Sequence, residues 1–338
     1  MDVKASLFAL SRAIGPSGVE TPAVEAARAL LAPLVDETQI DAMGSLIGLR
    51  RCGRPDARRV LLDAHLDEVS MVVTGQTEGY LRFASLGIDA RLLPATTVQV
   101  LTEPPMHGVI TCLPPHVLTA AEREKPFDEE KLFIDCGLTE EQAKAILPGT
   151  RVAYDTEPLS LAGDTVSGKS LDNRAGFCVL LRAMDMLAGE TLPVDVVVLG
   201  SVQEEVSGLG AKTGAFSQMP DLALVVDVTF ARQPDTPKAG TFPLGSGPAI
   251  GVGPELHRSI SDRLRRLAPE ASLEVLEGNT GTNAAETQIA REGIPTGLVS
   301  LPQRYMHTPV ETVRLGDIDA CARLIADWIL SLGEEASA

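Results

Sequence analysis

The stretch VDVVVLGSVQEE, residues 194–205, decides the fold of this chain. Its apolar run is too short for a helix and ends in polar residues, which is typical of a buried strand. Three more runs have the same character: RVLLDA at 59–64, LALVVDV at 222–228 and TGLVSL at 296–301. Helical patterns separate these runs, so the sequence predicts an α/β fold in which a mixed sheet is sandwiched by helices.

Several segments have apolar residues at helical spacing. Residues 1–33 predict two helices around the turn GPSG at 15–18. Further helices are predicted after Asp172 at 174–189, and at 257–268, 283–292 and 317–332.

The pattern changes between residues 74 and 163, where short strand-like pieces are separated by proline and glycine. Only 139–146 predicts a short helix there, and the α/β pattern resumes at Lys169. We therefore expect an α/β domain made of residues 1–73 and 164–338, with a mostly β domain inserted at 74–163.

Composition excludes several classes of partner. The 338 residues carry 29 basic and 46 acidic side chains, and the net charge of −17 disfavours nucleic acid and anionic lipid. No apolar span approaches the ~20 residues of a membrane helix, and the N-terminal segment has charges and a Gly-Pro break where a secretion signal needs an apolar core. Five cysteines, odd in number and widely spaced, indicate free thiols in a reducing cytoplasm.

Five potential metal ligands lie where strands are expected to end in loops. Three carboxylates and two neutral imidazoles would offset most of the charge of two Zn²⁺ or Co²⁺ ions. The five residues are His65, Asp172, Glu205, Asp227 and His307.

His65 and Asp172 each have a local structural alternative. Asp67 shares a strand face with His65, so its carboxylate could bond the second imidazole nitrogen and select the tautomer, although a purely structural pair is also possible. Asp172 stands at the entrance of an apolar helix and could be either a ligand that bridges two metals or an N-cap.

Glu204 and Glu205 follow a strand that is committed to the interior, so a solvated face does not explain them. We expect Glu205 to ligate a metal and Glu204 to hold and deprotonate a water molecule. Asp227 could instead be a turn residue. His307 precedes Thr308-Pro-Val-Glu311, which could be a helix-capping box and would leave the histidine unexplained.

Taken in order, these motifs resemble metallopeptidase family 42, the dinuclear aminopeptidases that build tetrahedral (TET) particles and include glutamyl aminopeptidases. The resemblance covers nearly the whole chain. Besides the ligand positions it includes GPSG at 15–18, GVI at 108–110, Pro115-His116, LFIDCG at 132–137, Gly247-Pro248, Gly281-Thr282, EGIP at 292–295 and RYMH at 304–307.

The resemblance implies a zinc-peptidase-like catalytic domain, an inserted β domain used for assembly, and a homo-oligomer such as a dodecamer. It also implies two divalent metal ions per subunit, usually zinc or cobalt. By position, His65, Glu205, Asp227 and His307 would be terminal ligands and Asp172 the bridge. Asp67 would orient His65, and Glu204 would be the general base and acid.

The function implied is a metal-dependent aminopeptidase that cleaves peptides with a hydroxide shared by the two metals. One alternative is a metal-independent, endoglucanase-type glycoside hydrolase that uses Glu204 as an acid. One Trp, three Tyr and eight Phe give it few aromatic rings to stack on sugars. The other alternative is a catalytically silent assembly protein.

The chain departs from the family pattern in two places. VSGLG at 206–210 shifts a glycine and lacks an arginine, and Asn283 replaces an aspartate, with Glu286 shortly after it. We expect Asn283 to remove a charge near the substrate.

Overall fold

Four parallel strands form the centre of an eight-stranded sheet in this computed structural model, which describes residues 1–124 and 128–333. They are β12 (Asp195–Ser201), β3 (Arg59–His65), β13 (Leu222–Phe230) and β16 (Thr296–Gln303), side by side in that order. These are the four apolar runs of the sequence, and their burial on both sides explains why each run is almost continuously apolar.

Two strands flank this centre on each side and make the sheet mixed. On one side, β2 (Leu46–Arg50) runs antiparallel to β12 and pairs with β1 (Glu37–Ile40). On the other side, β14 (Ala249–Val252) runs antiparallel to β16 and pairs with β15 (Ser272–Val275). The predicted fold class, a mixed sheet sandwiched by helices, is confirmed, although these four outer strands were not predicted.

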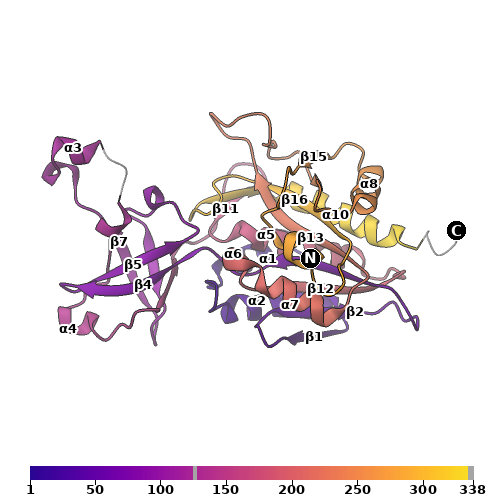
Figure 1. Cartoon of the computed structure of the whole chain (residues 1–338), viewed down its shortest axis with the longest axis horizontal. Helices are drawn as coiled ribbons and strands as arrows, with labels where there is room; N and C mark the ends of the chain where they lie inside the picture. The colour runs from indigo at the N-terminus through magenta and orange to yellow at the C-terminus, as the bar shows by residue number, and fades with distance from the viewer. Residues whose placement is uncertain (125–127, 334–338) are drawn as a thin grey trace.

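Helices cover both faces of the sheet (Figure 1). Val60 and Leu62 of β3 pack on one face, whereas Leu61 packs on the opposite face. The first face is covered by α1 (Val3–Arg12), α2 (Thr21–Leu31), α5 (Leu171–Met186), α8 (Arg258–Leu267) and α10 (Leu315–Ser331). The opposite face carries α7 (Leu209–Gln218), which was not predicted, and α9 (Asn283–Gln288), which is shorter than predicted.

Six strands close into a barrel that projects from one end of the sheet unit (Figure 1). In barrel order they are β4 (Ser70–Thr77), β5 (Tyr80–Leu86), β8 (Phe133–Asp135), β7 (Met106–Thr111), β6 (Thr97–Val100) and β9 (Arg151–Tyr154). The barrel has its own apolar core, which includes Met71, Leu81 and Ile134. The predicted short helix is α4 (Glu140–Ala143), and a second one, α3 (Ala120–Arg123), was missed.

A small sheet connects the barrel back to the larger unit. Its strands are β10 (Leu159–Ser160), β11 (Thr165–Gly168) and β17 (Glu311–Arg314). Because β11 leads into Asp172 and β17 follows His307, this sheet brings two distant segments of the predicted metal site together.

Within the described residues, no helix has the length and apolar character that crossing a membrane requires. All five cysteines lie in that part of the chain and are free thiols.

Candidate active site

The carboxyl ends of the central strands meet at one edge of the sheet, where ligand sites of α/β folds usually lie. The edge holds a cavity of about 420 Å³. Its lining includes all five predicted ligands together with Glu204: His65, Asp172, Glu204, Glu205, Asp227 and His307.

The expectation that every ligand follows the end of a strand is only partly correct. His65 is the last residue of β3, and Glu204 and Glu205 open the short helix α6 (Glu204–Ser207) directly after β12. Asp227, in contrast, lies inside β13, which continues to Phe230. The strand was predicted to end at residue 228, and it continues because Thr229 and Phe230 still pair with β16.

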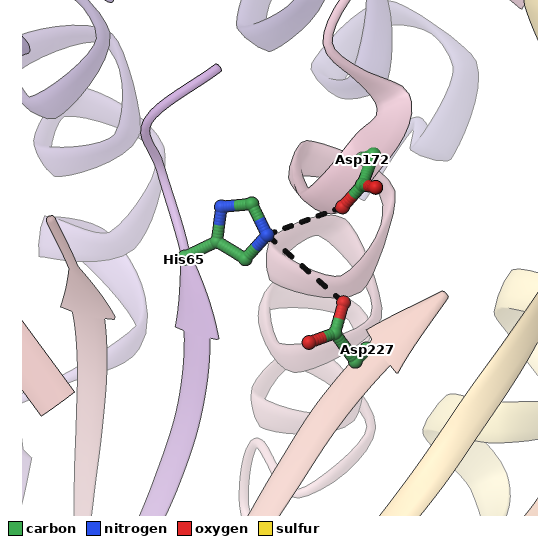
Figure 2. Close-up of side chains that lie close together, drawn as sticks. All are labelled: His65, Asp172 and Asp227. Carbon is green, nitrogen blue, oxygen red and sulfur yellow. Dashed lines mark hydrogen bonds and ion pairs between the residues drawn. The ribbon is translucent and has the colours of Figure 1, made fainter. Parts of the chain in front are cut away.

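Asp172 lies between two imidazoles. Its Oδ1 is 3.1 Å from Nε2 of His65, and its Oδ2 is 3.4 Å from Nε2 of His307. Figure 2 shows His65 on β3, Asp172 at the start of α5 and Asp227 on β13 converging on one point. His65 Nε2 is 4.0 Å from Asp227 Oδ1, and His307 Nε2 is 3.4 Å from Glu205 Oε2.

The N-cap alternative for Asp172 is wrong. Asp172 and Asn173 have non-helical backbone angles, so the regular turns of α5 begin after them. Asn173 performs the capping instead, because its Oδ1 accepts the backbone N–H of Gly176 at 3.1 Å. The Asp172 carboxylate is thereby left to face the imidazoles.

These side chains form two groups that could each hold a metal ion, and the groups share Asp172. In each group the ligand atoms lie within 4.8 Å of one another. The first group is His65, Asp172 and Asp227, and the second is Asp172, Glu205 and His307. Glu205 Oε1 is buried and has no hydrogen-bond partner among the described residues, as expected of an oxygen whose natural partner is a cation.

The electrostatics of the cavity also favour bound cations. Burial raises the pKa of Glu205 and of Asp227 well above the usual range, and repulsion from Asp172 adds to both shifts. Burial opposes protonation of His307, but its hydrogen bond to Asp172 and the charge of Glu205 outweigh burial and raise its pKa to about 10. Divalent cations would supply the positive charge that the buried carboxylates lack.

Asp67 lies beside His65, as expected, and also anchors the start of α6. Its Oδ1 is 3.3 Å from His65 Nδ1. The same carboxylate accepts the backbone N–H groups of Glu204 at 3.0 Å and Glu205 at 3.1 Å, and the Ser17 hydroxyl at 2.7 Å. One side chain therefore orients an imidazole and positions both glutamates, and the second of these tasks was not predicted.

Glu204 faces the cavity from the first residue of α6. Its Oε2 is 3.8 Å from His65 Nε2. Burial raises the pKa of Glu204, and the charge of Asp172 raises it further against the effect of His65. A carboxylate with a raised pKa binds a proton more readily, which suits a group that must accept a proton and release it again.

Glu311 is a site residue whose role was missed. The predicted capping box is wrong, because Glu311 begins a strand, β17, and no helix starts there. Its carboxylate is 1% exposed and accepts two backbone N–H groups, those of Asp172 at 3.0 Å and His307 at 2.8 Å. Glu311 therefore holds the backbone of two potential ligands from different elements.

A buried ionic cluster lies behind the site. Glu68 Oε2 is 2.7 Å from Lys169 Nζ, and Glu68 Oε1 is 3.4 Å from Arg174 Nη2. Glu68 Oε1 also accepts the backbone N–H of Gly15 at 2.7 Å. The cluster joins Glu68, which follows Asp67, to Lys169 and Arg174, which lie on either side of Asp172 in the sequence. No local sequence pattern indicated that these charges pair.

Asn283 lies next to the cavity lining but is not part of it. It is 1% exposed, does not line the cavity, and donates its side-chain N–H to Ser201 Oγ at 2.8 Å. Glu286 forms an ion pair with Lys212 at 3.0 Å. The loss of a charge near the substrate at position 283 stays a prediction.

Comparisons with known proteins are consistent with this architecture. Residues 44–324 match the family model described as M42 glutamyl aminopeptidase. The lysyl aminopeptidase of Pyrococcus furiosus is 30% identical over 310 residues, which is 87% of each chain. An aminopeptidase structure from the archaeon Desulfurococcus kamchatkensis has a TM-score of 0.89 and 32% identity, covering 97% of this chain and 94% of that one. A TET1 peptidase of Pyrococcus horikoshii, described as assembling into a tetrahedron or a large octahedral shell, has a TM-score of 0.83 and 29% identity, covering 97% and 99%.

Proposed function

Since this chain belongs to the M42 glutamyl aminopeptidase family and is a peptide hydrolase, we propose that it uses two divalent metal ions to remove N-terminal residues from peptides. His65 and Asp227 would be the terminal ligands of one ion, and Glu205 and His307 those of the other. Asp172 would bridge the two. Zinc and cobalt are the ions that best suit this mixture of imidazole and carboxylate donors.

The placement of Asp172 is the observation that carries this proposal. Its two carboxylate oxygens face two different imidazoles, at 3.1 Å and 3.4 Å. A carboxylate that served one ion would need only one of those contacts. The unpartnered Glu205 Oε1 supports the same assignment from the second group.

When bound, the two metal ions would acidify a water molecule and polarise the peptide carbonyl. Glu204 takes the proton of the attacking water and returns it to the departing amine. Asp67 keeps the His65 ring in place through the contact at Nδ1, so that Nε2 faces the cavity. The free α-amino group of the substrate would be held by one of the ions together with the nearby carboxylates, which would limit cleavage to the first residue.

Neither alternative function is retained. A glycoside hydrolase is not favoured, because the family is one of peptidases. A catalytically silent assembly protein is not favoured either, because Glu204 and suitable side chains at all five ligand positions line the cavity.

Metal removal tests the proposal. We expect EDTA to abolish hydrolysis of aminoacyl-p-nitroanilides, and Co²⁺, Zn²⁺ or Mn²⁺ to restore it. Elemental analysis of the reloaded protein should give two ions per chain. Glu204→Gln should keep both ions while turnover falls by ~10²–10⁴ or more. Activity that survives chelation, or near-normal turnover of Glu204→Gln, would contradict the mechanism.

We also infer that the chain divides into a catalytic unit and an inserted unit that serves assembly into a homo-oligomer. The inserted unit was expected at residues 74–163, but its first barrel strand, β4, begins at Ser70 and Met71 packs in the barrel core, so we place its start at Ser70. The separate apolar core of the barrel supports an independent unit. Exposed apolar side chains on its surface, Leu113 and Val117 among them, support a role in contacts between copies.

A further inference from the structure

The cavity wall beyond the proposed metal ligands is uncharged. Apart from those ligands and Glu204, the residues that line it are Val206, Ser207, Val228, Gly281, Thr282 and Met306. No lysine or arginine of the described chain is among the lining residues. This wall is the surface left to contact a substrate side chain once the α-amino group and the scissile carbonyl are bound.

Cations on the elements around the cavity are engaged elsewhere. Lys212 of α7 pairs with Glu286 at 3.0 Å. Arg304, which follows β16, donates from Nε to the backbone carbonyl of Arg232 at 2.7 Å. The two cations near Asp172, Lys169 and Arg174, pair with Glu68 in the interior. None of these four side chains lines the cavity, so none is placed to neutralise an acidic substrate side chain.

A charged substrate side chain would lose hydration against this wall, and the six neutral residues of the wall offer it no ion pair. Burial of an unpaired carboxylate or ammonium group is strongly unfavourable. An acidic side chain would also lie near Glu204 and Glu205. An apolar side chain would instead gain contact with Val206, Val228 and Met306.

Building on the proposed function, we propose that this enzyme selects uncharged, chiefly apolar N-terminal residues such as leucine and methionine, and discriminates against glutamate and lysine. Selectivity arises from the neutral wall formed by residues 206–207, Val228, residues 281–282 and Met306. The preference named by the family description, glutamyl, would thus not extend to this chain.

A substrate panel tests the preference directly. The metal-loaded enzyme is assayed with the p-nitroanilides of leucine, methionine, lysine and glutamate. We expect kcat/KM for leucine or methionine to exceed that for glutamate by at least about 100-fold, with lysine also below leucine. A glutamate or lysine substrate that equals or exceeds leucine overturns the inference and leaves the aminopeptidase function intact. If no member of the panel is cleaved, the proposed function itself fails.

A charge placed on the wall tests its role. Val206 is 48% exposed, so Val206→Arg can be accommodated and should raise the ratio of glutamate to leucine hydrolysis by about tenfold or more. Val206→Leu is the neutral control at the same position, and Ser217→Arg places the same charge on exposed α7, away from the cavity. Because the ratio compares two substrates on one preparation, partial loss of folded protein does not change it. An unchanged ratio in Val206→Arg would show that the wall does not contact the substrate side chain.

Discussion

Each carboxylate oxygen of Asp172 lies near a different imidazole, at 3.1 Å from His65 and 3.4 Å from His307. The pKa of Asp172 is held below its usual value, because the hydrogen bonds from both histidines outweigh the effect of burial. At the residue scale, the site therefore depends on how firmly this one side chain is oriented.

Glu311 supplies part of that orientation, because it accepts the backbone N–H of Asp172. Glu311→Gln should weaken metal binding by about 10- to 100-fold. Glutamine keeps one accepting oxygen, but its NH₂ group cannot accept a hydrogen bond, so one of the two backbone N–H contacts is lost. Competition with a chromophoric chelator measures the affinity. Thr312→Val is the matched control, since within the described part of the chain that hydroxyl bonds only to the Val310 carbonyl. Unaltered affinity in Glu311→Gln would remove its positioning role.

Much of the site was recognisable from single residues, and Glu311 was not. Polar side chains directly after apolar runs indicated His65, Glu204 and Glu205, since a buried strand gives them no other reason to be there. Glu311 acts on the backbone of Asp172, 139 positions away, and only the fold brings the two together.

At the scale of elements, the central strands were predictable and the outer ones were not. Residues of β12 are buried on both faces, so nearly all are apolar. Only alternate residues of β15 are partly buried, and β1 is mostly exposed, so neither contains an apolar run. The helix α7, LGAKTGAFSQ, has two glycines and little amphipathic pattern.

The cluster of Glu68, Lys169 and Arg174 ties the end of β3 to the start of α5, and it supports a prediction about stability. Glu68→Gln leaves two buried cations without their counter-charge and should lower the free energy of unfolding by ~3–5 kcal/mol at pH 7. Urea denaturation measures the loss, with the exposed Glu141→Gln as control. A change similar to that of the control would mean that the cluster does not stabilise the fold.

The same cluster gives this stability difference a pH dependence. Burial raises the pKa of Glu68, but Lys169 and Arg174 outweigh burial and hold it below its usual 4.5. A carboxyl group with a lowered folded pKa stabilises the protein above the unfolded pKa, and this contribution is lost as the pH falls through the folded pKa. The difference between wild type and Glu68→Gln should therefore shrink below pH 4.5, and a difference that grew there would contradict the assigned charge state.

At the scale of the whole molecule, the barrel stands apart from the α/β unit and has a core of its own (Figure 1). Leu113 and Val117 are 58% and 59% exposed on the barrel side. Exposure of these apolar side chains to water is unfavourable, and a partner surface that covered them would remove this exposure. A second copy of this chain is the partner we propose, as the family resemblance implies.

We accordingly expect the purified protein to have a mass several times the 35.7 kDa of one chain, as measured by light scattering. The double variant Leu113→Glu with Val117→Glu should shift that mass downward while circular dichroism stays unchanged. Val275→Glu, at a 73% exposed position on β15, is the control and should leave the mass unaltered. If the control dissociates the oligomer and the barrel variant does not, the contacts lie on the α/β unit instead.

The sequence by itself determined the central strands and the side chains gathered at their carboxyl ends. Apolar runs of strand length can be buried only inside a sheet, and polar residues that follow them must face a cavity or water. Tertiary structure alone decided that Asp172 faces two imidazoles, that Glu311 accepts the backbone N–H groups of Asp172 and His307, and that Asn283 bonds to Ser201. Such contacts join residues far apart in the chain, so they depend on the path of the whole backbone and leave no local pattern.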